Sequence, residues 1–516
     1  MTAVLQQPSG DTQKPSEPEA ERATWLARAA TLPLPTNAIV DGAELSAGGG
    51  SLPVIGPRDG NELTRVFAGD DAAVDHAVRA ARVAFDSGPW PRMSPRERAA
   101  VLLRLADLAE QHRDELALLI TLEMGKPITH SRDIEMRAVV NCLRWYAEVA
   151  DKGHGEVRDT DPQALALVTR EPVGVVGIVT PWNFPLTLTM WKLAPALIAG
   201  CTTVVKPAEQ SPLSILRLAQ LAIEAGLPPG VLNVVPGTGP VAGQALGLHA
   251  GVDALAFTGS TATGRAFARY GADSNLKRVW LELGGKSPNI ILPDAPDLQR
   301  AVDTAVWAFT FNSGQMCTCG SRLIVHRDLA DEVVENVVRG ARAVPVGDPL
   351  DPAVEMGPIA TAAQLASVRG YIDRAVAAGA RLLTGGSHAP DRAGLPAGGN
   401  WLEPTILTDV APDSELARTE VFGPVLAMTV VDSTDEAVEI ANDCEYGLAA
   451  AVWTSDLSTA HTVSRRLRAG TVWVNCYEEG DMGVPFGGFG LSGNGRDKSA
   501  HALDKYTELK TTWMQL

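Results

Sequence analysis

Three side chains that lie far apart in the chain are of the types that together act on a carbonyl group. Cys317, in the stretch FNSGQMCTCGSR, follows an amphipathic apolar segment and lies near a glycine, so its sulfur could face a cleft as a nucleophile. The stretch VTPWNFP supplies the amide of Asn183, and LELGGKSP supplies the carboxylate of Glu282. The amide and the backbone N–H of Cys317 can donate to an oxyanion, and the carboxylate can act as a base. The three stretches therefore favour thiol-based carbonyl chemistry.

Each of the three residues also has a purely structural explanation. A free cysteine is most often a buried, inert core residue, and an asparagine after a strand is usually a turn former. A glutamate that ends an apolar strand, as Glu282 does, is costly unless it is functional or satisfied by a structural partner. Behind Glu282, we expect the pair Gly284 and Gly285 to leave open space suited to a cofactor ring. These alternatives hold for each residue alone, and the combination of the three outweighs them.

The composition narrows the kinds of partner. The chain has 516 residues, 45% of them hydrophobic, and a formal net charge of −17. Because nucleic acids and anionic membranes bind basic surfaces, we expect neither as a partner, which leaves small molecules and proteins. No apolar run approaches the roughly 18 residues of a membrane span. Six cysteines without framework spacing, and no signal peptide, predict a protein of the reducing cytoplasm.

The order of helical and β-rich segments predicts an α/β protein of at least two domains. Residues 1–22, rich in Pro, Glu, Gln and Ser, are expected to be a disordered tail. Helix signals begin at Asp70, and the capping box SPRE opens a long helix that we expect to run towards 125–127; a Ser-Pro opening recurs in SPLSILRLAQLAIEAG. From Val173, and again after Gly285, short strands alternate with helices, which indicates parallel sheets covered on both faces. Ligands usually bind in the cleft between two such halves.

Two further segments alternate like strands outside these halves. They are ALALVTR, within 153–172, and the end of the chain, within 496–516. Because an exposed edge strand pairs readily, we expect the two to form a small sheet that extends onto another subunit of a homo-oligomer.

The dinucleotide signal is an unusual one. No G-x-G-x-x-G fingerprint is present, since the nearest match, from Gly237 to Gly243, is one residue too long. The stretch FTGSTATG instead places Gly259, Ser260 and Gly264 between a strand and a helix, where N–H groups and a hydroxyl can meet one phosphate.

In this order, the motifs TPWNFP, FTGST, LELGGKSP, FNSGQ-x-C, EVFGPV and PFGG resemble those of the aldehyde dehydrogenase superfamily, from about residue 35 to the end. The resemblance implies NAD-dependent oxidation of an aldehyde, with Cys317 as nucleophile, Asn183 as oxyanion donor and Glu282 as general base. It also implies a homodimer or homotetramer. The implied parts are a Rossmann-type NAD-binding domain at 23–152 and 173–284, an α/β catalytic domain at 285–495, and β oligomerisation strands at 153–172 and 496–516.

The resemblance also assigns the cofactor contacts. They are Gly259, Ser260 and Gly264 at the pyrophosphate, Lys206 and Glu209 at the adenosine ribose, Glu420 at the nicotinamide ribose, Phe422 beside the nicotinamide ring, and Trp182 and Leu283. A carboxylate at Glu209 can accept from both ribose hydroxyls and would repel a 2′-phosphate, which Lys206 offsets only in part. NAD is therefore favoured, and NADP is possible but less favoured.

The stretch NCYEEGDMGVPFGG lies where the family builds the mouth of its substrate tunnel, and it contains Glu478, Glu479 and Asp481. Carboxylates in a confined mouth would attract a cationic group, and the alternative is a solvated acidic loop. GDM-x-VPFGG, SGNGRDKS-x-HAL-x-K and TELK resemble γ-glutamyl-γ-aminobutyraldehyde and guanidinobutyraldehyde dehydrogenases of polyamine and arginine breakdown. This likeness favours an ω-amino or ω-amido aldehyde of about four carbons as the substrate, with Glu479 and Asp481 recognising its end group. The residues expected to wall its methylene chain are Phe184, Leu188 and Trp191.

Other functions compete with this interpretation. A broad-specificity aliphatic or aromatic aldehyde dehydrogenase would use the same motifs. A cysteine hydrolase or acyltransferase would need a histidine base, and none of the nine histidines lies in a matched motif. A non-catalytic relative would have no use for the three reactive side chains. Two departures from the family are Phe489-Gly490 in place of Tyr-Lys and Cys319 two residues after the nucleophile, and without a nearby Cys or His cluster this C-x-C pair predicts no metal site.

Overall fold

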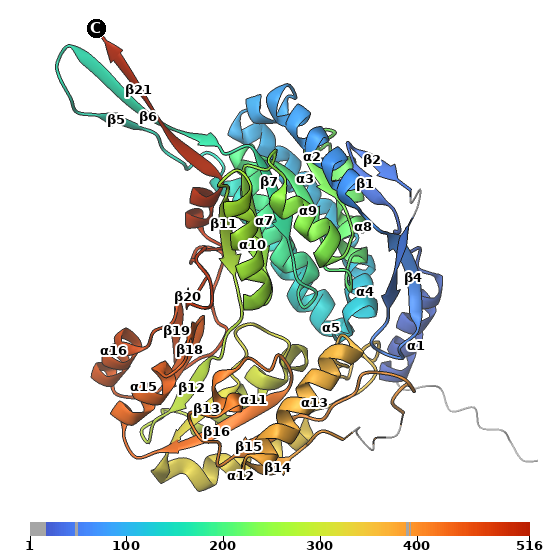
Figure 1. Cartoon of the computed structure of the whole chain (residues 1–516). Coiled ribbons are helices and arrows are strands. Elements are labelled where there is room, and N and C mark those ends of the chain that lie inside the picture. The colour runs from blue at the N-terminus through green and yellow to red at the C-terminus, as the bar shows by residue number, and fades with distance from the viewer. Residues whose placement is uncertain (1–16, 47–49, 389–391, 393) are drawn as a thin grey trace, which may run out of the picture.

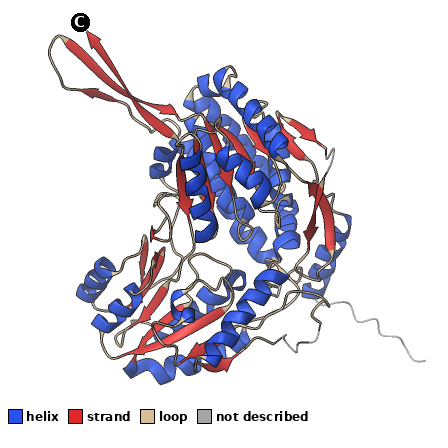
Figure 2. Ribbon diagram, in the orientation of Figure 1, coloured by secondary structure: helices blue, strands red, loops and turns tan. Residues whose placement is uncertain are grey.

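The computed structural model describes residues 17–46, 50–388, 392 and 394–516, and these form two lobes with a projecting arm (Figure 1). Each lobe is built on a seven-stranded sheet, and the arm is a three-stranded sheet. Figure 2 shows helices on both sides of each large sheet. Within the described part of the chain, no helix combines the length and the apolar character that a membrane crossing requires.

The sheet of the first lobe is parallel from β11 to β9, and β1 joins it antiparallel. In spatial order its strands are β11 (Arg278–Glu282), β10 (Ala254–Thr258), β7 (Val175–Val179), β8 (Thr202–Lys206), β9 (Leu232–Val234), β1 (Ala38–Val40) and β2 (Ala43–Leu45). Every residue of β7, β8 and β10 is buried because helices cover both faces. The helices of this lobe are α1 (Glu17–Thr31), α2 (Asp71–Asp86), α3 (Pro95–Gln111), α4 (Arg113–Met124), α5 (Ile128–His130), α6 (Met136–Val149), α7 (Pro185–Ala199), α8 (Leu213–Glu224), α9 (Gln244–Leu248) and α10 (Thr261–Asp273).

The sheet of the second lobe is also parallel, except for β14 at one edge. In spatial order its strands are β14 (Arg381–Thr384), β15 (Thr405–Thr408), β16 (Val425–Val431), β13 (Arg322–His326), β12 (Pro288–Ile291), β18 (Ala449–Trp453) and β19 (Thr471–Val474). Its helices are α11 (Leu298–Thr310), α12 (Ala330–Ala343), α13 (Ala362–Ala377), α14 (Glu415–Arg418), α15 (Thr434–Asn442) and α16 (Leu457–Arg466). Two parallel α/β halves are the architecture that the alternation of strands and helices predicts.

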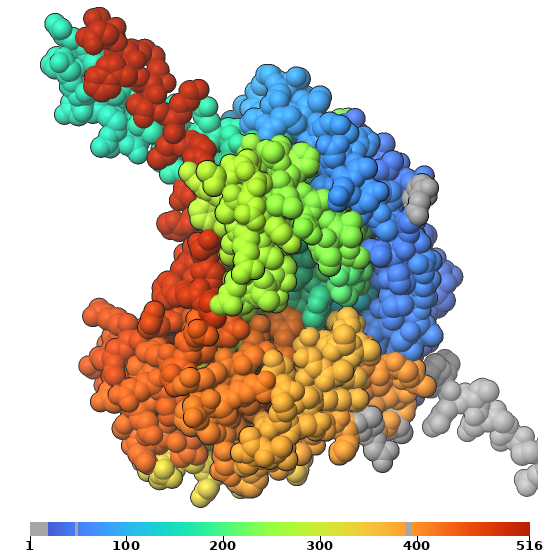
Figure 3. All heavy atoms as spheres, in the orientation of Figure 1, coloured from blue at the N-terminus to red at the C-terminus, as the bar shows by residue number. Residues whose placement is uncertain are grey.

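The arm consists of three antiparallel strands. It projects away from the first lobe (Figure 3). β21 (Thr507–Gln515) pairs with β6 (Ala164–Pro172) along its whole length, and β5 (Glu156–Arg158) lies on the other side of β6. Leu509 and Trp513 of β21 are exposed. The pairing agrees with the alternating sequence patterns, and the contact of this sheet with another subunit stays a prediction.

The first 70 residues differ most from the sequence-based expectation. α1 begins at Glu17, so residues 17–22 are helical and do not belong to a disordered tail, while residues 1–16 lie outside the described residues. Tertiary contacts stabilise this helix, since Trp25 is buried and Arg22 forms an ion pair of 3.2 Å with Asp348. Two short hairpins were not predicted: β1 with β2, and β3 (Ser51–Ile55) with β4 (Glu62–Phe67). A smaller pair, β17 (Tyr446–Gly447) with β20 (Phe489–Gly490), lies near the second sheet.

Some helices are capped by adjacent residues of the sequence, and others by a side chain from a distant helix. Ser94 and Glu97 form the predicted capping box at α3, although the helix ends at Gln111 and α4 begins two residues later. At α8 the Ser-Pro opening gives no side-chain cap. Instead the buried carboxylate of Glu123, from α4, accepts the N–H groups of Leu213 at 2.6 Å and Ser214 at 3.2 Å. Packing between helices therefore provides the cap that the local sequence does not.

Candidate active site

The loop that contains Asn183 and the loop that contains Cys317 are bound to each other. The Asn183 side-chain amide donates to the carbonyl of Gln315 at 3.0 Å, and the Asn312 amide donates to the carbonyl of Asn183 at 3.1 Å. Asn312 and Ser313 have φ values of 51° and 57°, so the chain turns sharply after α11 and directs the next residues towards Asn183. The two predicted groups thus meet at one point between the lobes.

A buried ion pair fixes the start of α7, directly after Asn183. Pro185 is the first residue of α7, and Phe184 gives no side-chain cap. The Glu135 carboxylate instead accepts the N–H groups of Leu186 at 3.1 Å and of Thr187 at 3.2 Å, and its other oxygen binds the Lys126 ammonium. The same ammonium lies 3.8 Å from the ring centroid of Phe184.

We expect Glu135→Ala to lower the free energy of unfolding by about 3–5 kcal/mol, because it leaves the Lys126 ammonium buried without a carboxylate and removes the cap of α7. The double variant Glu135→Gln with Lys126→Met keeps an oxygen acceptor for the cap and removes both charges. Its free energy of unfolding should therefore fall much less than that of Glu135→Ala. Urea unfolding of the two variants measures the difference. Equal losses would show that the ion pair itself contributes nothing beyond packing.

A cavity of about 270 Å³ lies between the lobes, and most of the predicted site residues line it. The predicted residues that line it are Trp182, Asn183, Leu188, Gly259, Ser260, Leu283, Cys317, Glu420 and Phe422. Sequence reasoning did not single out six further lining residues, which are Pro181, Val421, Thr258, Gln364, Ser367 and Tyr371. The last three belong to α13, whose ordinary amphipathic sequence gives no functional signal.

The surroundings of Cys317 favour its neutral thiol over the thiolate. Burial raises its pKa well above the ordinary value, and the negative charges of Glu478, Glu420 and Glu282 raise it further. A neutral thiol needs a base or a nearby positive charge before it becomes a strong nucleophile. The neighbouring Cys319 is buried in the core of the second lobe. Among the described residues, no group of three or more His, Cys, Asp or Glu side chains is arranged to hold a metal ion.

Glu282 is buried, does not line the cavity, and has no hydrogen-bond partner for either carboxylate oxygen among the described residues. Burial raises its pKa well above the usual range, and the charge of Asp497 adds to this effect. Asp497 is held between two buried lysines, Lys192 at 2.6 Å and Lys505. A Cβ on Gly487 would lie 2.8 Å from Glu282 Oε1, so this glycine leaves room for the carboxyl group. Glu282 therefore lies beside Gly487, where the charges of Asp497, Lys192 and Lys505 act on its carboxyl group.

Gly284 lines the cavity, as the expectation of open space behind Glu282 requires, but neither Gly284 nor Gly285 has room for a side chain. A Cβ on Gly284 would overlap the Glu420 carboxylate, and one on Gly285 would overlap the carbonyl oxygen of Cys317. The Gly285 N–H donates to Glu420 Oε1 at 3.0 Å. These glycines are needed because the loop with Cys317 and the Glu420 side chain approach their backbone closely.

The start of α10 fits a phosphate group. Ser260 is the N-cap of this 13-residue helix, and Gly259 precedes it at the cavity wall. A Cβ on Gly264 would clash with the side chain of Leu283, so glycine lets the helix pack close to the end of β11. At the end of β8, the Lys206 ammonium donates to the carbonyl of Gly237 at 2.8 Å and lies 3.5 Å from the half-exposed Glu209 carboxylate.

The predicted substrate residues occupy three kinds of position. Leu188 lines the cavity, whereas Phe184 stacks on Phe311 at 6.2 Å and Trp191 packs against Phe486 at 5.1 Å. Glu479 and Asp481 are exposed and do not line the cavity around Cys317. The predicted place of these two carboxylates is the mouth of the substrate tunnel, and their contact with the substrate there stays a prediction.

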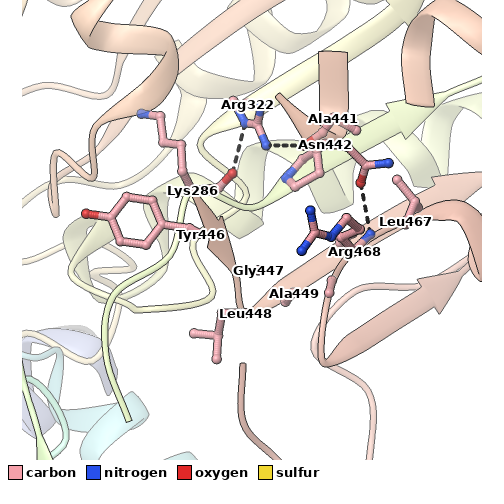
Figure 4. A pocket seen from close by; sticks show the side chains of 13 residues that line it. Lys286, Arg322, Ala441, Asn442, Tyr446, Gly447, Leu448, Ala449, Leu467 and Arg468 are labelled. Carbon is pink, nitrogen blue, oxygen red and sulfur yellow. Dashed lines mark hydrogen bonds between the residues drawn. The ribbon is translucent and has the colours of Figure 1, made fainter. Parts of the chain in front are cut away.

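Figure 4 shows a second cavity, lined by Lys286, Arg322, Asn442 and Arg468 among others. Its volume of about 10 Å³ is room for one water molecule. Arg322 is held by the carbonyls of Lys286 at 2.8 Å and Ala441 at 2.8 Å. Burial lowers the pKa of Lys286 to about 8. The size and these bonds indicate a structural junction between β12 and the segment after α15.

Comparison with known proteins agrees with this geometry. Residues 45–512 match the Aldehyde dehydrogenase family. The chain is 48% identical, over 96% of its length and 98% of the relative, to the NADP/NAD-dependent aldehyde dehydrogenase PuuC of Escherichia coli. Among solved structures, gamma-glutamyl-gamma-aminobutyraldehyde dehydrogenase from Burkholderia cenocepacia superimposes with a TM-score of 0.93 at 55% identity, over 96% of this chain and 99% of the other. Indole-3-acetaldehyde dehydrogenase AldA of P. syringae, in complex with NAD+ and IAA, gives 0.94 at 50% identity over the same shares. The chain belongs to the aldehyde dehydrogenase family and is an oxidoreductase that acts on aldehydes.

Proposed function

We propose that this protein oxidises an ω-amino or ω-amido aldehyde of about four carbons to the acid, with NAD as the hydride acceptor. The observation that carries the proposal is that Cys317, Asn183 and the start of α10 open on one cavity. The names of the PuuC relative and of the Burkholderia structure support the cofactor and the substrate class.

In the proposed reaction the Cys317 thiol gives its proton to a water molecule, and its sulfur bonds to the aldehyde carbon while the C=O π electrons move to the oxygen. The Asn183 amide has two N–H donors, of which one holds the carbonyl of Gln315 and the other can donate to the developing oxyanion, together with the N–H of Cys317. Bound NAD would supply the acceptor for the hydride that leaves this carbon. Glu420, Phe422 and Trp182 line the cavity where the nicotinamide end would lie.

Glu282 would act in the second half of the reaction. Once the thioester has formed, a water molecule must lose a proton as its oxygen bonds to the carbonyl carbon, and the C–S bond then breaks to release the acid. Rotation of Glu282 from the Asp497 network towards Cys317 would bring its carboxylate to this water. The raised pKa of Glu282 makes it a stronger base than an exposed glutamate.

A panel assay tests the proposal. NADH formation is measured at 340 nm with butanal, benzaldehyde and N-acyl derivatives of 4-aminobutanal. A kcat/KM that is highest for the amido aldehydes supports the substrate class, and equal values would favour a broad-specificity enzyme instead. If the protein cleaved thiol esters, or released an acid, without forming NADH, the cysteine hydrolase or acyltransferase alternative would be favoured.

We expect Glu209→Gln to lower the KM for NADP by roughly tenfold, because the neutral amide no longer repels a 2′-phosphate near the Lys206 ammonium. The KM for NAD should rise at the same time, since the amide accepts more weakly from the ribose hydroxyls. Glu224→Gln, at the exposed end of α8, is the matched control. An unchanged ratio of the two KM values would place the adenosine ribose elsewhere.

We also propose that the protein forms a homo-oligomer and that it is located in the reducing cytoplasm. The free edge and exposed apolar side chains of the arm support pairing with a second copy. All six cysteines are free, which fits a reducing compartment.

A further inference from the structure

Lys505 is a buried lysine that has no role in the chemistry proposed above, although it belongs to the network beside Glu282. It is the last residue of the short 3₁₀ helix η6 (Ala500–Lys505), which directly precedes the arm strand β21. The Lys505 ammonium donates to one oxygen of Asp497, and the Lys192 ammonium donates to the other oxygen at 2.6 Å. Two buried ammonium groups therefore share a single buried carboxylate.

The backbone holds this network against Glu282. Glu282 and Gly493 form an isolated antiparallel bridge, which ties the end of β11 to the segment that contains Asp497. A Cβ on Gly487 would lie 2.8 Å from Glu282 Oε1 and 3.0 Å from Arg496 Cδ, the residue before Asp497. The carboxyl group of Glu282 thus lies close to the chain that carries the acid of the network.

The charges of the network do not balance without Glu282. Asp497 carries one negative charge, and Lys192 and Lys505 carry two positive charges, so the three together have an excess of one positive charge. An ammonium group has three N–H donors, and each of these two forms one hydrogen bond among the described residues, to Asp497. Both oxygens of Glu282 are buried and have no donor there. An ionised Glu282 would neutralise the excess charge and match the spare donors.

The charges around Glu282 act on its pKa in opposite directions. Burial and Asp497 raise this pKa, whereas Lys192, Lys505 and Arg496 lower it. Burial opposes the ionisation of Asp497, but the two lysines hold its pKa below the usual value, so it stays a carboxylate. Burial lowers the pKa of Lys505, and the contact with Asp497 opposes this effect. The Asp497 carboxylate thus keeps the charge of Lys505 beside Glu282.

The other titratable groups around the network are neutral at physiological pH. Burial raises the pKa values of the Cys317 and Cys142 thiols and of the Tyr146 and Tyr506 hydroxyls. None of these four groups therefore cancels the charge of Lys505.

We propose that Lys505 is a positioning residue for Glu282, whose ammonium, held on Asp497, lets the buried Glu282 carboxyl group ionise at a lower pH than it otherwise would. The inference rests on the proposed function, because the ionised Glu282 is the base that accepts a proton from the water that cleaves the thioester. Lys505 does not line the cavity around Cys317, so its effect reaches the reaction through Glu282.

Removing the charge of Lys505 should move the pH profile of turnover. In Lys505→Met the ascending limb of the steady-state kcat should shift to higher pH by about one unit, the lower end of the effect of one neighbouring charge. At pH values below this limb kcat should fall roughly tenfold, because the ionised fraction of Glu282 falls by the same factor. The NADH burst should keep its rate and amplitude. Lys505→Arg keeps the positive charge and should keep the wild-type limb.

A double variant separates the charge of Lys505 from its packing. Lys505→Met with Asp497→Asn removes one positive and one negative charge, so Lys192 alone restores the excess positive charge of the wild type. The ascending limb should therefore return towards its wild-type position. Lys152→Met is the matched control, because this lysine also pairs with an aspartate, Asp151, but is exposed.

The ionisation of Glu282 is also measurable without turnover. In infrared difference spectra of the free protein, the C=O band of the protonated carboxyl group disappears as pH rises, and the loss of this band in Glu282→Gln assigns it. The midpoint of this titration should lie at higher pH in Lys505→Met than in the wild type, and at the wild-type pH in Lys505→Arg.

The outcomes are distinct. Equal midpoints in the wild type and Lys505→Met overturn the role of Lys505, while the aldehyde oxidation stands. A double variant that stays shifted as far as Lys505→Met overturns it too, because the effect is then one of packing. If the wild type forms no NADH with any aldehyde of the panel, the proposed function fails. A shifted infrared midpoint in Lys505→Met would still support control of Glu282 by this charge, and an unshifted one would refute it.

Discussion

Replacing Cys317 by alanine should abolish aldehyde-dependent NADH formation, with a loss of at least about a thousandfold in kcat, while the affinity for NAD stays within about twofold. The sulfur must bond to the carbonyl carbon before hydride can leave, and no other thiol can take its place, since Cys319 is buried in the core of the second lobe. The methyl group of alanine fits where the larger side chain was, so the cavity and the start of α10 should persist.

The measurement has two parts. Steady-state absorbance gives the rate, and quenching of tryptophan fluorescence by NAD gives the dissociation constant, with Trp182 at the cavity wall as the reporter. Cys444→Ala is the control, because that cysteine is free and half-exposed on the second lobe. Near-normal NADH formation by the Cys317 variant would refute thiol chemistry altogether.

Replacing Glu282 by glutamine should give a burst of NADH of about one equivalent per active site, followed by turnover at least about a hundredfold slower than in the wild type. Acylation and hydride transfer need no base at this position, whereas the water that cleaves the thioester does. Stopped-flow absorbance resolves the two phases. An unchanged steady-state rate after the burst would show that another group activates the water.

The pH profile provides an independent check on Glu282. Burial and the charge of Asp497 raise its pKa, so the carboxyl group is largely protonated at pH values where an exposed glutamate is ionised. Because only the ionised form can accept a proton from water, the steady-state kcat should increase as pH rises through this raised pKa. The burst amplitude should not follow the same curve, and in Glu282→Gln this limb of the profile should be absent.

The sequence predicted those features that depend on short stretches of chain. The capping box of Ser94 and Glu97 is complete within four residues. The stretches around Asn183 and Cys317 are each ambiguous alone, but together with the stretch around Glu282 they indicate carbonyl chemistry, and the alternation of strands and helices predicts a cleft between two α/β halves.

The features that were missed depend on contacts between distant segments. Glu135 and Glu123 cap helices far along the chain, and nothing near either residue indicates its partner. The Asp497 network also had a weak signal, because Lys192 is the one charged residue of α7 and its counter-ion comes from the other end of the sequence. The loop after Tyr477 shows the limit most clearly, since charge alone could not say that Glu478 turns inward while its neighbour Glu479 turns to solvent.

The isolated bridge between Asp497 and Phe486 has a consequence for how this segment tolerates sequence change. Asp497 enters the lysine network, and Lys498 then takes a left-handed conformation, with a φ of 61°, and lies against Trp191. Substitution at 498 therefore leaves the interior acid in place. Insertion or deletion of a single residue at the bridge would move Asp497 away from Lys192 and Lys505 and leave two buried lysines without their carboxylate. We therefore expect the side chain at 498 to vary among homologues, while the length of this segment stays fixed.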